Sequence, residues 1–542
     1  MWNLWRDIEH TLSVISCHRV HRCSGAVLFT LAFGLSGFTG ATTIYSVDSP
    51  ADTIDDNTGD SLCHTAAGKC TLRAAIMQAN VIADDVTINV PAGTYFLSLG
   101  ALNIAAPVSG VPLITISGAG RSATIIDGDA IDRVIAVAAG RNAKIIGVTL
   151  QHGKLTTGDG AGISNSGTLA ISDSTIDSNN AADTGTTGSG GGIYTPNSAD
   201  LTLDNVVVSN NVAAHSGGGL YLNGIAHLTG CTFFGNQTSG AGGAIYNSGG
   251  SVTVTRSALS VNSAGPYGGG VFLLSAQLTL DHAVVYGNSA GTGGGVSAQF
   301  STITANSSTI ADNTGFLAGG IYLDGSSAYI DDSTVSANTG YTTGGLDVHT
   351  SLAALYLTNS TVSGNTSTST SAGGGITNHG AANVYNSTIA FNRALTGYTS
   401  GSAQGGGVLN IGTFNARNTI IARNSRNTSP VDDDCSGTIG MYGNDRLGTL
   451  AGCTAAVAGT GSATLLDSAG ELGPLGDHGG PTATHSLVPP SNMINGGDTC
   501  IDRNGMVLER DQRGYARPIG AACDVGAFEY DPEDIFASNF EY

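Results

Sequence analysis

Basic residues are scarce in this chain: lysine and arginine together number 20, against 41 aspartates and glutamates, so the formal net charge is −21. Phosphate backbones and anionic membrane surfaces are bound by clustered Lys and Arg side chains. The shortage therefore excludes nucleic acid as a partner. Charged residues of both signs make up only 11% of the chain and apolar residues 41%, which excludes a disordered chain.

Long apolar runs are also missing, apart from one near the N-terminus at residues 26–35. Arg6, Arg19 and Arg22 precede this run, and small residues up to Ala41 follow it. The run is too short to cross a bilayer as a helix, and its flanks are those of an export signal cleaved after Ala41. An uncleaved signal anchor is the alternative. We expect no transmembrane helix in the mature chain.

Cysteine is sparse, with nine residues, and two of them, Cys17 and Cys23, lie in the predicted signal. Six of the others form close pairs along the chain, and Cys231 stands alone. Such pairs in an exported protein predict disulfides, although sequence leaves their connectivity open. The disulfide candidates are Cys63 and Cys70, Cys435 and Cys453, and Cys500 and Cys523. Their spacings do not match zinc ligands, and no metal, nucleotide or other cofactor is predicted.

Glycine is the residue in excess, with 80 copies. Many stand in a step of small residues, mostly Gly-Gly, that is followed by an aliphatic residue, and this step recurs every 25 to 32 residues. Repeats of this length are typical of solenoids, in which one unit cannot bury its apolar face alone. The aliphatic residues are Ile163, Ile193, Leu220, Ile245, Val271, Val296, Ile321, Leu346, Ile376 and Val408.

A second motif runs in phase with the glycine step: a short strand-like segment that ends in Asn. An apolar residue stands three positions before each Asn. The Asn residues are Asn179, Asn210, Asn236, Asn262, Asn288, Asn313, Asn338, Asn365, Asn392 and Asn424. The apolar residues are Ile176, Val207, Phe233, Leu259, Val285, Ile310, Val335, Val362, Ile389 and Ile421.

The two motifs together predict a parallel β-helix, an all-β solenoid. Strands are short, turns carry Gly or Asn, and there is no helical period. Each strand must therefore pair with its copy in the next coil, about 4.8 Å away. The aliphatic residues then form an internal column, and an Asn stack bonds side chain to side chain at the corners.

Two further columns are expected from the alternation of side chains along a strand. Small residues five positions before the Asn should point inward, which makes Cys231 a buried free thiol. They are Ser174, Cys231, Ser257, Ala283, Ser308, Ser333, Ser360 and Ser387. Threonines one position later should point outward. They are Thr175, Thr232, Thr309, Thr334, Thr361 and Thr388. Such a stripe is a hypothetical glycan or ice surface; the alternative is that Thr simply favours strands.

The open ends of a β-helix need caps. At the N-terminal end, Leu72, Ala75, Ile76 and Ala79 lie on one face of a predicted short helix that crosses the first coil. The acidic stretch 52–60 before it is either a Ca²⁺ site or a solvated loop; it does not match an EF-hand loop.

Specific segments resemble known families. The run Cys70-Thr-Leu-Arg-Ala-Ala75 resembles the CSLREA motif of bacterial secreted proteins, with Thr71 and Ala74 where the motif has Ser and Glu. The repeats resemble those of polymorphic outer membrane proteins. The segments 472–487, 511–514 and 523–529 resemble the choice-of-anchor Q family. These resemblances imply a right-handed parallel β-helix, secreted or at the outer membrane or cell surface of a Gram-negative bacterium, with no established activity.

The expected organisation has five parts. Residues 1–41 are the signal peptide and 42–84 an N-terminal cap with the CSLREA-like motif. Residues 85–428 are the parallel β-helix. An irregular, choice-of-anchor Q-like C-terminal cap covers 429–530, and a short tail covers 531–542.

Catalytic candidates are few. Asp331 and Asp332 are the best carboxylate pair inside the repeats, but Asp332 falls in a turn column that turn chemistry explains. That column also holds Asp173, Asp204, His282, Asn359, Asn386 and Asn418. Asp347 and His349 lie in a strand and are a second candidate pair. The segment Asp432-Asp-Asp434 is predicted to be a solvated loop. Arg256 and His282 are the groups nearest to a lyase-like position in the central repeats.

From these observations the sequence predicts a non-catalytic, monomeric protein of adhesion or surface interaction, whose partner is an extracellular glycan or protein surface. The alternative is a carbohydrate-active enzyme of the pectin lyase-like β-helix class. A groove with carboxylates on neighbouring coils would favour the enzyme, and a smooth face of Thr, Ser and Asn would favour interaction.

Overall fold

The computed structural model describes residues 42–181, 187–196, 199–369, 373–395, 405–426, 431–458, 462–465 and 471–533. The predicted signal peptide, and the tail from residue 534 onward, lie outside the described residues. Within the described part, no helix combines the length and the apolarity that a membrane crossing requires.

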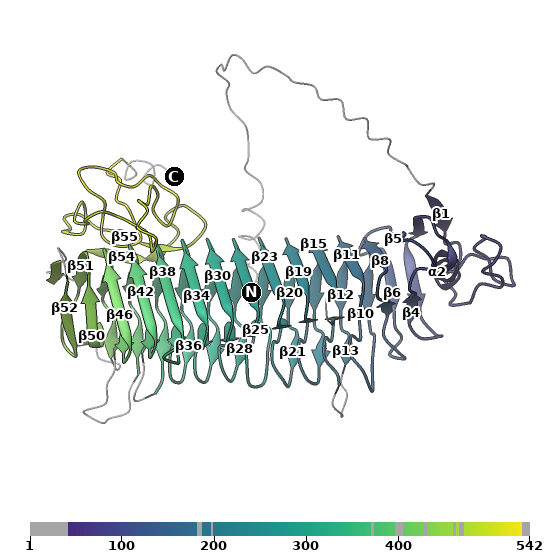
Figure 1. Cartoon of the computed structure of the whole chain (residues 1–542), viewed down its shortest axis with the longest axis horizontal. Helices are drawn as coiled ribbons and strands as arrows, with labels where there is room; N and C mark the ends of the chain where they lie inside the picture. The colour runs from purple at the N-terminus through teal and green to yellow at the C-terminus, as the bar shows by residue number, and fades with distance from the viewer. Residues whose placement is uncertain are drawn as a thin grey trace, which may run out of the picture. The chain divides into compact units, whose positions relative to one another are not determined.

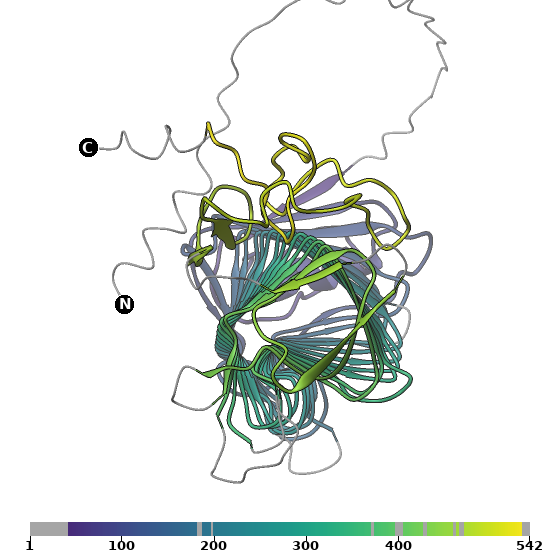
Figure 2. The same ribbon diagram turned by 90° about the vertical axis from the view of Figure 1, so that its left-hand side faces the viewer.

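The chain winds into a parallel β-helix capped by one short helix, α2 (Leu72–Val81), which confirms the predicted fold (Figure 1). Seen from the end, the coils superimpose around a shared interior (Figure 2). A complete coil runs through four strands, which we assign in chain order to sheets 1, 2, 3 and 4. Pairing between successive coils is parallel throughout these sheets, except at β49 (Val431–Asp432).

Each sheet is a file of short strands of similar length. Sheet 1 contains β1 (Thr43–Ser46), β2 (Val86–Val90), β5 (Leu113–Gly118), β8 (Asn142–Ile146), β11 (Thr168–Ser172), β15 (Asp200–Asp204), β19 (Ile225–Thr229), β23 (Ser251–Thr255), β26 (Gln277–Asp281), β30 (Thr302–Asn306), β34 (Ser327–Asp331), β38 (Ala354–Thr358), β42 (Ala381–Tyr385), β46 (Thr413–Arg417), β50 (Cys435–Met441) and β52 (Cys453–Val457). Sheet 2 contains β3 (Gly93–Phe96), β6 (Thr124–Asp127), β9 (Thr149–Gln151), β12 (Thr175–Asp177), β16 (Val207–Ser209), β20 (Thr232–Phe234), β24 (Ala258–Ser260), β27 (Val284–Tyr286), β31 (Thr309–Ala311), β35 (Thr334–Ser336), β39 (Thr361–Ser363), β43 (Thr388–Ala390), β47 (Ile420–Ala422), β51 (Asn444–Leu447) and β53 (Ser462–Leu465).

The other two sheets have shorter strands. Sheet 3 contains β13 (Asn180–Ala181), β17 (Val212–Ala213), β21 (Gln237–Thr238), β28 (Ser289–Ala290), β32 (Thr314–Gly315), β36 (Thr339–Gly340), β40 (Thr366–Ser367), β44 (Arg393–Ala394), β48 (Ser425–Arg426) and β49. Sheet 4 contains β4 (Leu102–Ile104), β7 (Ile135–Val137), β10 (Ile163–Asn165), β14 (Ile193–Thr195), β18 (Leu220–Leu222), β22 (Ile245–Ser248), β25 (Val271–Leu274), β29 (Val296–Gln299), β33 (Ile321–Asp324), β37 (Leu346–Val348), β41 (Ile376–Asn378) and β45 (Val408–Asn410), and its edge continues into the first residues of β50.

The predicted aliphatic column is the inner face of sheet 4. All ten residues that follow the glycine step are fully buried and belong to one apolar cluster that runs along the helix. They pair in register from coil to coil, as Ile193 does with Leu220 and Leu220 with Ile245. The small column predicted in sheet 2 is also buried, and the thiol of Cys231 lies in it as expected. Burial raises the pKa of that thiol to about 11.

The glycine step is needed because neighbouring coils approach closely there. A Cβ atom on Gly219 would lie 2.7 Å from the carbonyl oxygen of Ala244 in the next coil. On Gly243 it would lie 2.3 Å from the oxygen of Gly269. Both distances are below ordinary contact, so the coils can approach this closely only with small residues at the corner; most are glycine, and Ala244 takes the place of Gly219 in the next coil.

The Asn residues form a buried ladder. Asn288 donates its backbone N–H and its side-chain Nδ2 to Oδ1 of Asn313, at 3.0 Å each, and Asn313 repeats both bonds to Asn338. The ladder ends on Asp434, whose Oδ1 accepts two bonds from Asn424. Asp434 is fully buried and Asp433 is 2% exposed. The prediction that this acidic segment is a solvated loop is therefore wrong for these two residues.

One coil was predicted in the wrong register. Asn211, not Asn210, belongs to the ladder, and Val208, not Val207, is its buried apolar residue. The sequence there is Val206-Val-Val208 followed by Ser and two Asn, so two registers one residue apart both satisfy the motif. A shift of one residue exchanges the inner and outer faces. The same shift moves the turn position from Asp204 to Asn205, which has a φ of 53°.

The N-terminal cap is held by Arg73. The helix α2 begins after Thr71, whose hydroxyl accepts a bond from the Ala74 N–H. Arg73 then forms two bonds to the Asp52 carboxylate and donates to the carbonyls of Gly100 and Ala101 in the first coils. The predicted apolar face of the helix is buried. The CSLREA-like segment is thus the device that closes this end, and its disulfide joins Cys63 to Cys70.

The C-terminal cap packs on the outer face of sheet 2. Thr361 donates to Oε1 of Gln512 at 2.6 Å, and Nε2 of Gln512 reaches Oγ1 of Thr334 at 2.9 Å. Thr388 accepts a bond from the Ala527 N–H. The outward direction of the threonines is confirmed, but these three are buried under the cap rather than open to a ligand.

The cap has little regular structure of its own. Its hairpin consists of β54 (Leu472–Gly476) and β55 (Thr484–Leu487). The disulfide Cys500–Cys523 lies within it, and Cys435–Cys453 closes the last coils. All three predicted pairings are therefore confirmed.

The Asn ladder predicts a position-specific loss of stability. Asn313→Ala removes the acceptor of two buried donors of Asn288, at a cost of about 2–4 kcal/mol. We expect a clear fall in the thermal unfolding midpoint, followed by circular dichroism. Asn306→Ala, an outward Asn of the same coil, is the matched control and should change the midpoint little. Equal shifts would show that the ladder does not stabilise the coils.

Cap docking gives a second prediction. Gln512→Ala removes the acceptor of the buried Thr361 hydroxyl and one of the two partners of the Thr334 hydroxyl, so we expect a loss of about 2–4 kcal/mol of docking free energy. Limited proteolysis should then cleave within 471–533 faster than in the unaltered protein. Gln299→Ala, which changes a glutamine of sheet 4, serves as the control. Unchanged cleavage rates would contradict the role given to Gln512.

Candidate functional site

Outward-pointing side chains with proton-transfer chemistry gather on three neighbouring strands of sheet 4. Asp347 on β37 pairs in register with Tyr322 on β33 and with Thr377 on β41. Two positions further along, the same coils carry Asp324, His349 and His379. Because side chains alternate along a strand, both sets face away from the core. Two rows of polar side chains therefore lie side by side on the outer face of sheet 4. One row is Tyr322, Asp347 and Thr377, and the other is Asp324, His349 and His379.

Asp347 and His349 are the centre of this group. The Asp347 side chain is 2% exposed, and its Oδ1 has no hydrogen-bond partner among the described residues. The nearest charged neighbour is the His349 imidazole, with Nδ1 3.8 Å from Oδ1. That separation suits an ion pair and is longer than a hydrogen bond. The His349 side chain is 41% exposed, so the pair joins a buried carboxylate to a solvent-facing imidazole.

The surroundings favour the charged form of this imidazole. Asp347, as the nearest acceptor and negative charge, raises the pKa of His349 above its usual value, and burial opposes this. The ring of Tyr322 lies 4.9 Å from that of His349, and the ring of His379 lies 6.0 Å away. Burial, together with the charges of Asp347 and Asp324, raises the pKa of Tyr322.

This arrangement can move protons. Imidazole is the side chain whose ordinary pKa lets it both donate and accept a proton at physiological pH. A buried carboxylate beside it stabilises its protonated form by charge. Asp324 and Asp347 stand diagonally on adjacent coils, about 8 Å apart at their Cα atoms given a strand spacing of about 4.8 Å and a rise of about 3.3 Å per residue.

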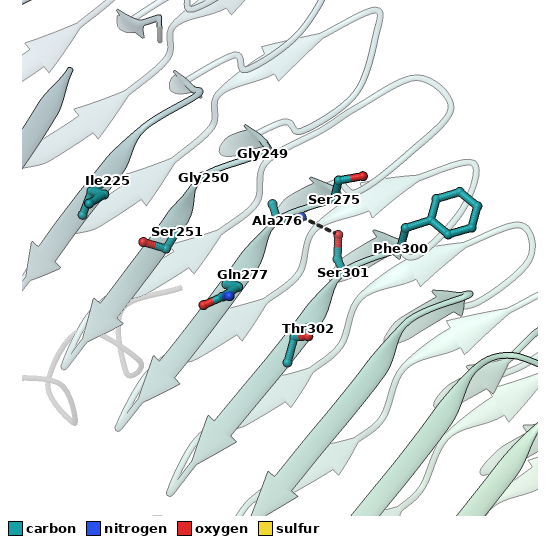
Figure 3. A pocket seen from close by; sticks show the side chains of 10 residues that line it. All are labelled: Ile225, Gly249, Gly250, Ser251, Ser275, Ala276, Gln277, Phe300, Ser301 and Thr302. Atoms are coloured by element: carbon teal, nitrogen blue, oxygen red, sulfur yellow. Dashed lines mark hydrogen bonds between the residues drawn. The ribbon is translucent and has the colours of Figure 1, made fainter. Parts of the chain in front are cut away.

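A shallow hollow lies along the turns that lead from sheet 4 to sheet 1, and Figure 3 shows its lining. Its volume is about 390 Å³. Phe300 stands at its edge with 64% of its surface exposed. The lining residues are Ile225, Gly249, Gly250, Ser251, Ser275, Ala276, Gln277, Phe300, Ser301 and Thr302.

The other carboxylate pair singled out by the sequence is used in cap docking. Asp331 forms two bonds of 2.7 Å with Arg503 of the cap. Asp332 accepts a bond from Asn359, and burial raises its pKa to about 6. Its φ of 51° confirms the turn column. These two groups are therefore structural.

The residues of the acidic stretch 52–60, near the N-terminus, have two different roles. Asp52 binds Arg73, and Asp55 accepts bonds from the backbone of Asn57 and His64. Asp56, Asp60 and His64 remain close together, with ligand atoms within 4.8 Å of one another. They are exposed or half-buried and form contacts among themselves.

Of the residues in the sheet 4 group, the sequence had singled out Asp347 and His349, and the structure brings them together. Tyr322, Asp324 and Phe300 were missed. A signal was present, because each occupies a fixed position after the aliphatic residue of the glycine step. Aligning the outward positions of the repeats, and not only the inward ones, would have placed Tyr322 beside Asp347 and Asp324 beside His349.

Comparisons with known proteins show similarity in fold alone. No protein-family model matches the chain, and no curated protein is significantly similar to it. Solved structures with a similar course include the A-module of the mannuronan C-5 epimerase AlgE4 from Azotobacter vinelandii, with 15% identity over 78% of this chain and 99% of that one, and a TM-score of 0.30. A mannuronic acid specific polysaccharide family 6 lyase from human gut microbiota has 9% identity over 77% and 91%, and a TM-score of 0.30.

A third similar structure is the catalytic domain of a GH87 α-1,3-glucanase, with 11% identity over 78% of this chain and 68% of that one, and a TM-score of 0.27. These neighbours are carbohydrate-active enzymes, and they contradict the prediction that the chain has no catalytic activity. We therefore do not retain that prediction. At these TM-scores the likeness identifies neither catalytic residues nor a substrate.

The Asp347–His349 pair predicts a titration. In the folded protein His349 should titrate above about 6.5, the ordinary imidazole value, followed by NMR of the ring protons. Asp347→Asn removes the main cause and should lower this pKa. Asp324→Asn removes a smaller charge effect and should lower it less. Because the pKa of His349 is higher in the folded state than in the unfolded chain, protonation of His349 increases the free energy of unfolding at low pH. This contribution is lost as the pH rises through the folded-state pKa. An unchanged midpoint in Asp347→Asn would contradict the pairing.

Proposed function

We propose that the protein is a polysaccharide-acting enzyme whose acid–base centre is the Asp347–His349 pair on sheet 4. The observation that carries this proposal is the buried Asp347 carboxylate, unsatisfied at Oδ1, behind a solvent-facing imidazole. A purely structural aspartate at this depth would normally have its hydrogen bonds satisfied. An unsatisfied one beside a histidine with a raised pKa is typical of a functional site.

The named groups have distinct roles in this proposal. His349 exchanges a proton with the glycosidic oxygen or with a sugar carbon. Asp347 is a positioning residue that holds the ring and stabilises its charge. Tyr322 packs against one side of the imidazole and limits its rotation. Asp324, on the neighbouring coil, is the second carboxylate within reach of the same substrate.

Surface attachment explains these observations less well. It requires a long, open, flat face, and the cap covers sheet 2 at Thr334, Thr361 and Thr388. It also gives no reason for an unsatisfied carboxylate under an exposed imidazole. Action outside the cytoplasm belongs to the same proposal, and the three disulfides support it because such bonds persist in oxidising compartments.

The test is loss of activity in matched histidine variants. His349→Ala and Asp347→Asn should each lower kcat on the cleaved polysaccharide by about 10²–10⁴-fold, the usual contribution of acid–base catalysis. Release of reducing ends from a polysaccharide panel measures it. His282→Ala is the control, because His282 also contacts an aspartate, Asp281 at 2.9 Å, but stands on an exposed turn. Full activity in His349→Ala would overturn the assignment.

A further inference from the structure

We propose, on the basis of the function above, that the substrate is an uncharged polysaccharide. It lies in the hollow beside Phe300 and is cleaved by hydrolysis at His349. Three observations support this: the Phe300 edge of the hollow lies two coils from His349 along one row of turns, the lining of the hollow is uncharged, and basic side chains are scarce on the surrounding coils.

The hollow and the pair share one edge of the β-helix. Phe300 covers Gly325, where a Cβ atom would lie 2.9 Å from two ring carbons of the phenylalanine. The N–H of Gly325 in turn donates to Oγ1 of Thr350 at 2.8 Å. Gly325 follows Asp324 in the chain, and Thr350 follows His349. Phe300, Gly325 and Thr350 are therefore successive steps of one row of turns that leads from the hollow to the catalytic groups.

The lining offers hydroxyl, amide and backbone groups but no charge. Ser251, Gln277 and Thr302 are successive first residues of sheet 1 strands, in register and half-buried or exposed. Such groups match the many hydroxyls of a sugar chain. The ring of Phe300 projects away from the strands at the edge of the hollow (Figure 3), where an apolar sugar face can pack on it. A coil spacing of about 4.8 Å repeats these contacts along the chain direction.

Charge decides between a neutral polymer and a polyuronate. Residues 225–392, the coils that contain the hollow and the Asp347–His349 pair, include six aspartates, one arginine (Arg256) and no lysine or glutamate. A polyuronate carries one negative charge per sugar, so these coils repel it. Removing the C5 proton of a uronate also requires that its carboxylate be neutralised. Arg256 follows the last residue of β23, at the other end of that strand from the hollow, and the protonated His349 serves as the proton donor. A neutral sugar needs no further cation.

The chemistry that follows for a neutral sugar is hydrolysis. Protonated His349 gives its proton to the glycosidic oxygen, and the bond from that oxygen to the anomeric carbon breaks. Asp324 takes a proton from water, whose oxygen bonds to the anomeric carbon. One water is consumed, and one hydroxyl and one new reducing end are formed. The proton given by His349 stays in the new hydroxyl; Asp324 then releases its proton to solvent and His349 takes up another, which restores both groups.

The first experiment compares polymers. The full mature chain is incubated with neutral β- and α-glucans, xylan and galactan, and with polygalacturonate and alginate, each with and without Ca²⁺. We expect reducing ends from a neutral polymer only, and their loss in His349→Ala and in Asp324→Asn. Cleavage of a polyuronate alone, if abolished in His349→Ala, would overturn the neutral-substrate inference and leave the proposed enzyme intact.

The second experiment tests the hollow. Phe300→Ala should raise KM for the neutral polymer about tenfold, the effect of losing part of a buried aromatic contact, and leave kcat unchanged. Phe234→Ala, which changes another exposed phenylalanine, at 45% exposure on sheet 2, is the control. Equal KM values in the two variants would overturn the hollow as the subsite. Affinity electrophoresis of the catalytically impaired Asp347→Asn variant measures polysaccharide binding separately from turnover. If binding depends on Phe300 but the unaltered protein cleaves no polymer, the proposed enzymatic activity is refuted while the hollow remains a binding site.

Discussion

Register between successive coils is the constraint on which the whole molecule depends. At the glycine step the backbones of neighbouring coils come so close that a Cβ atom at Gly219 or Gly243 would strike a carbonyl oxygen of the next coil. Packed against the same step, each Asn of the ladder offers Oδ1 to two donors of the preceding coil. A coil displaced by one residue would break both contacts and turn its apolar residues outward. Close backbone packing and the buried ladder thus select one register together.

The same register assembles the candidate site from residues that are distant in sequence. Tyr322 and Asp347 come from strands 25 residues apart and meet only because β33 and β37 pair in register. His349 lies in the next outward position of its coil, where it contacts Tyr322 on one side and His379 on the other. No loop is needed to bring these groups together, so their positions are as rigid as the coil stack. Rigid elements hold catalytic geometry better than loops do.

The sequence predicted the interior well because the interior repeats. Every inward column recurs from coil to coil, so its members support one another. One error arose where Val206-Val-Val208 and two adjacent Asn allow two registers, and another at the end of the Asn ladder, where Asp433 and Asp434 are buried rather than solvated. The cap is different. Gln512 contacts Thr361 and Thr334, which precede it by more than 150 residues, and no repeated motif indicates that contact. The site lies between these cases. Asp347 and His349 were recognised within one strand, whereas Tyr322 and Asp324 required the outward positions of the neighbouring coil.

Cap and site divide the polar chemistry of the molecule between them. Three of the four arginines of the cap lie in ion pairs that hold it together or dock it: Arg503 with Asp331, Arg513 with Asp511, and Arg517 with Glu529. The fourth, Arg510, donates to the carbonyl of Gly514 within the cap. The basic side chains of the cap therefore bind the β-helix and the cap itself. In the coils around His349, by contrast, the acidic and basic side chains other than histidine are all aspartates. The field at His349 is set by Asp347 and Asp324, which favours a protonated imidazole and disfavours an anionic ligand. A proton donor beside an uncharged hollow is the combination that a neutral glycan requires.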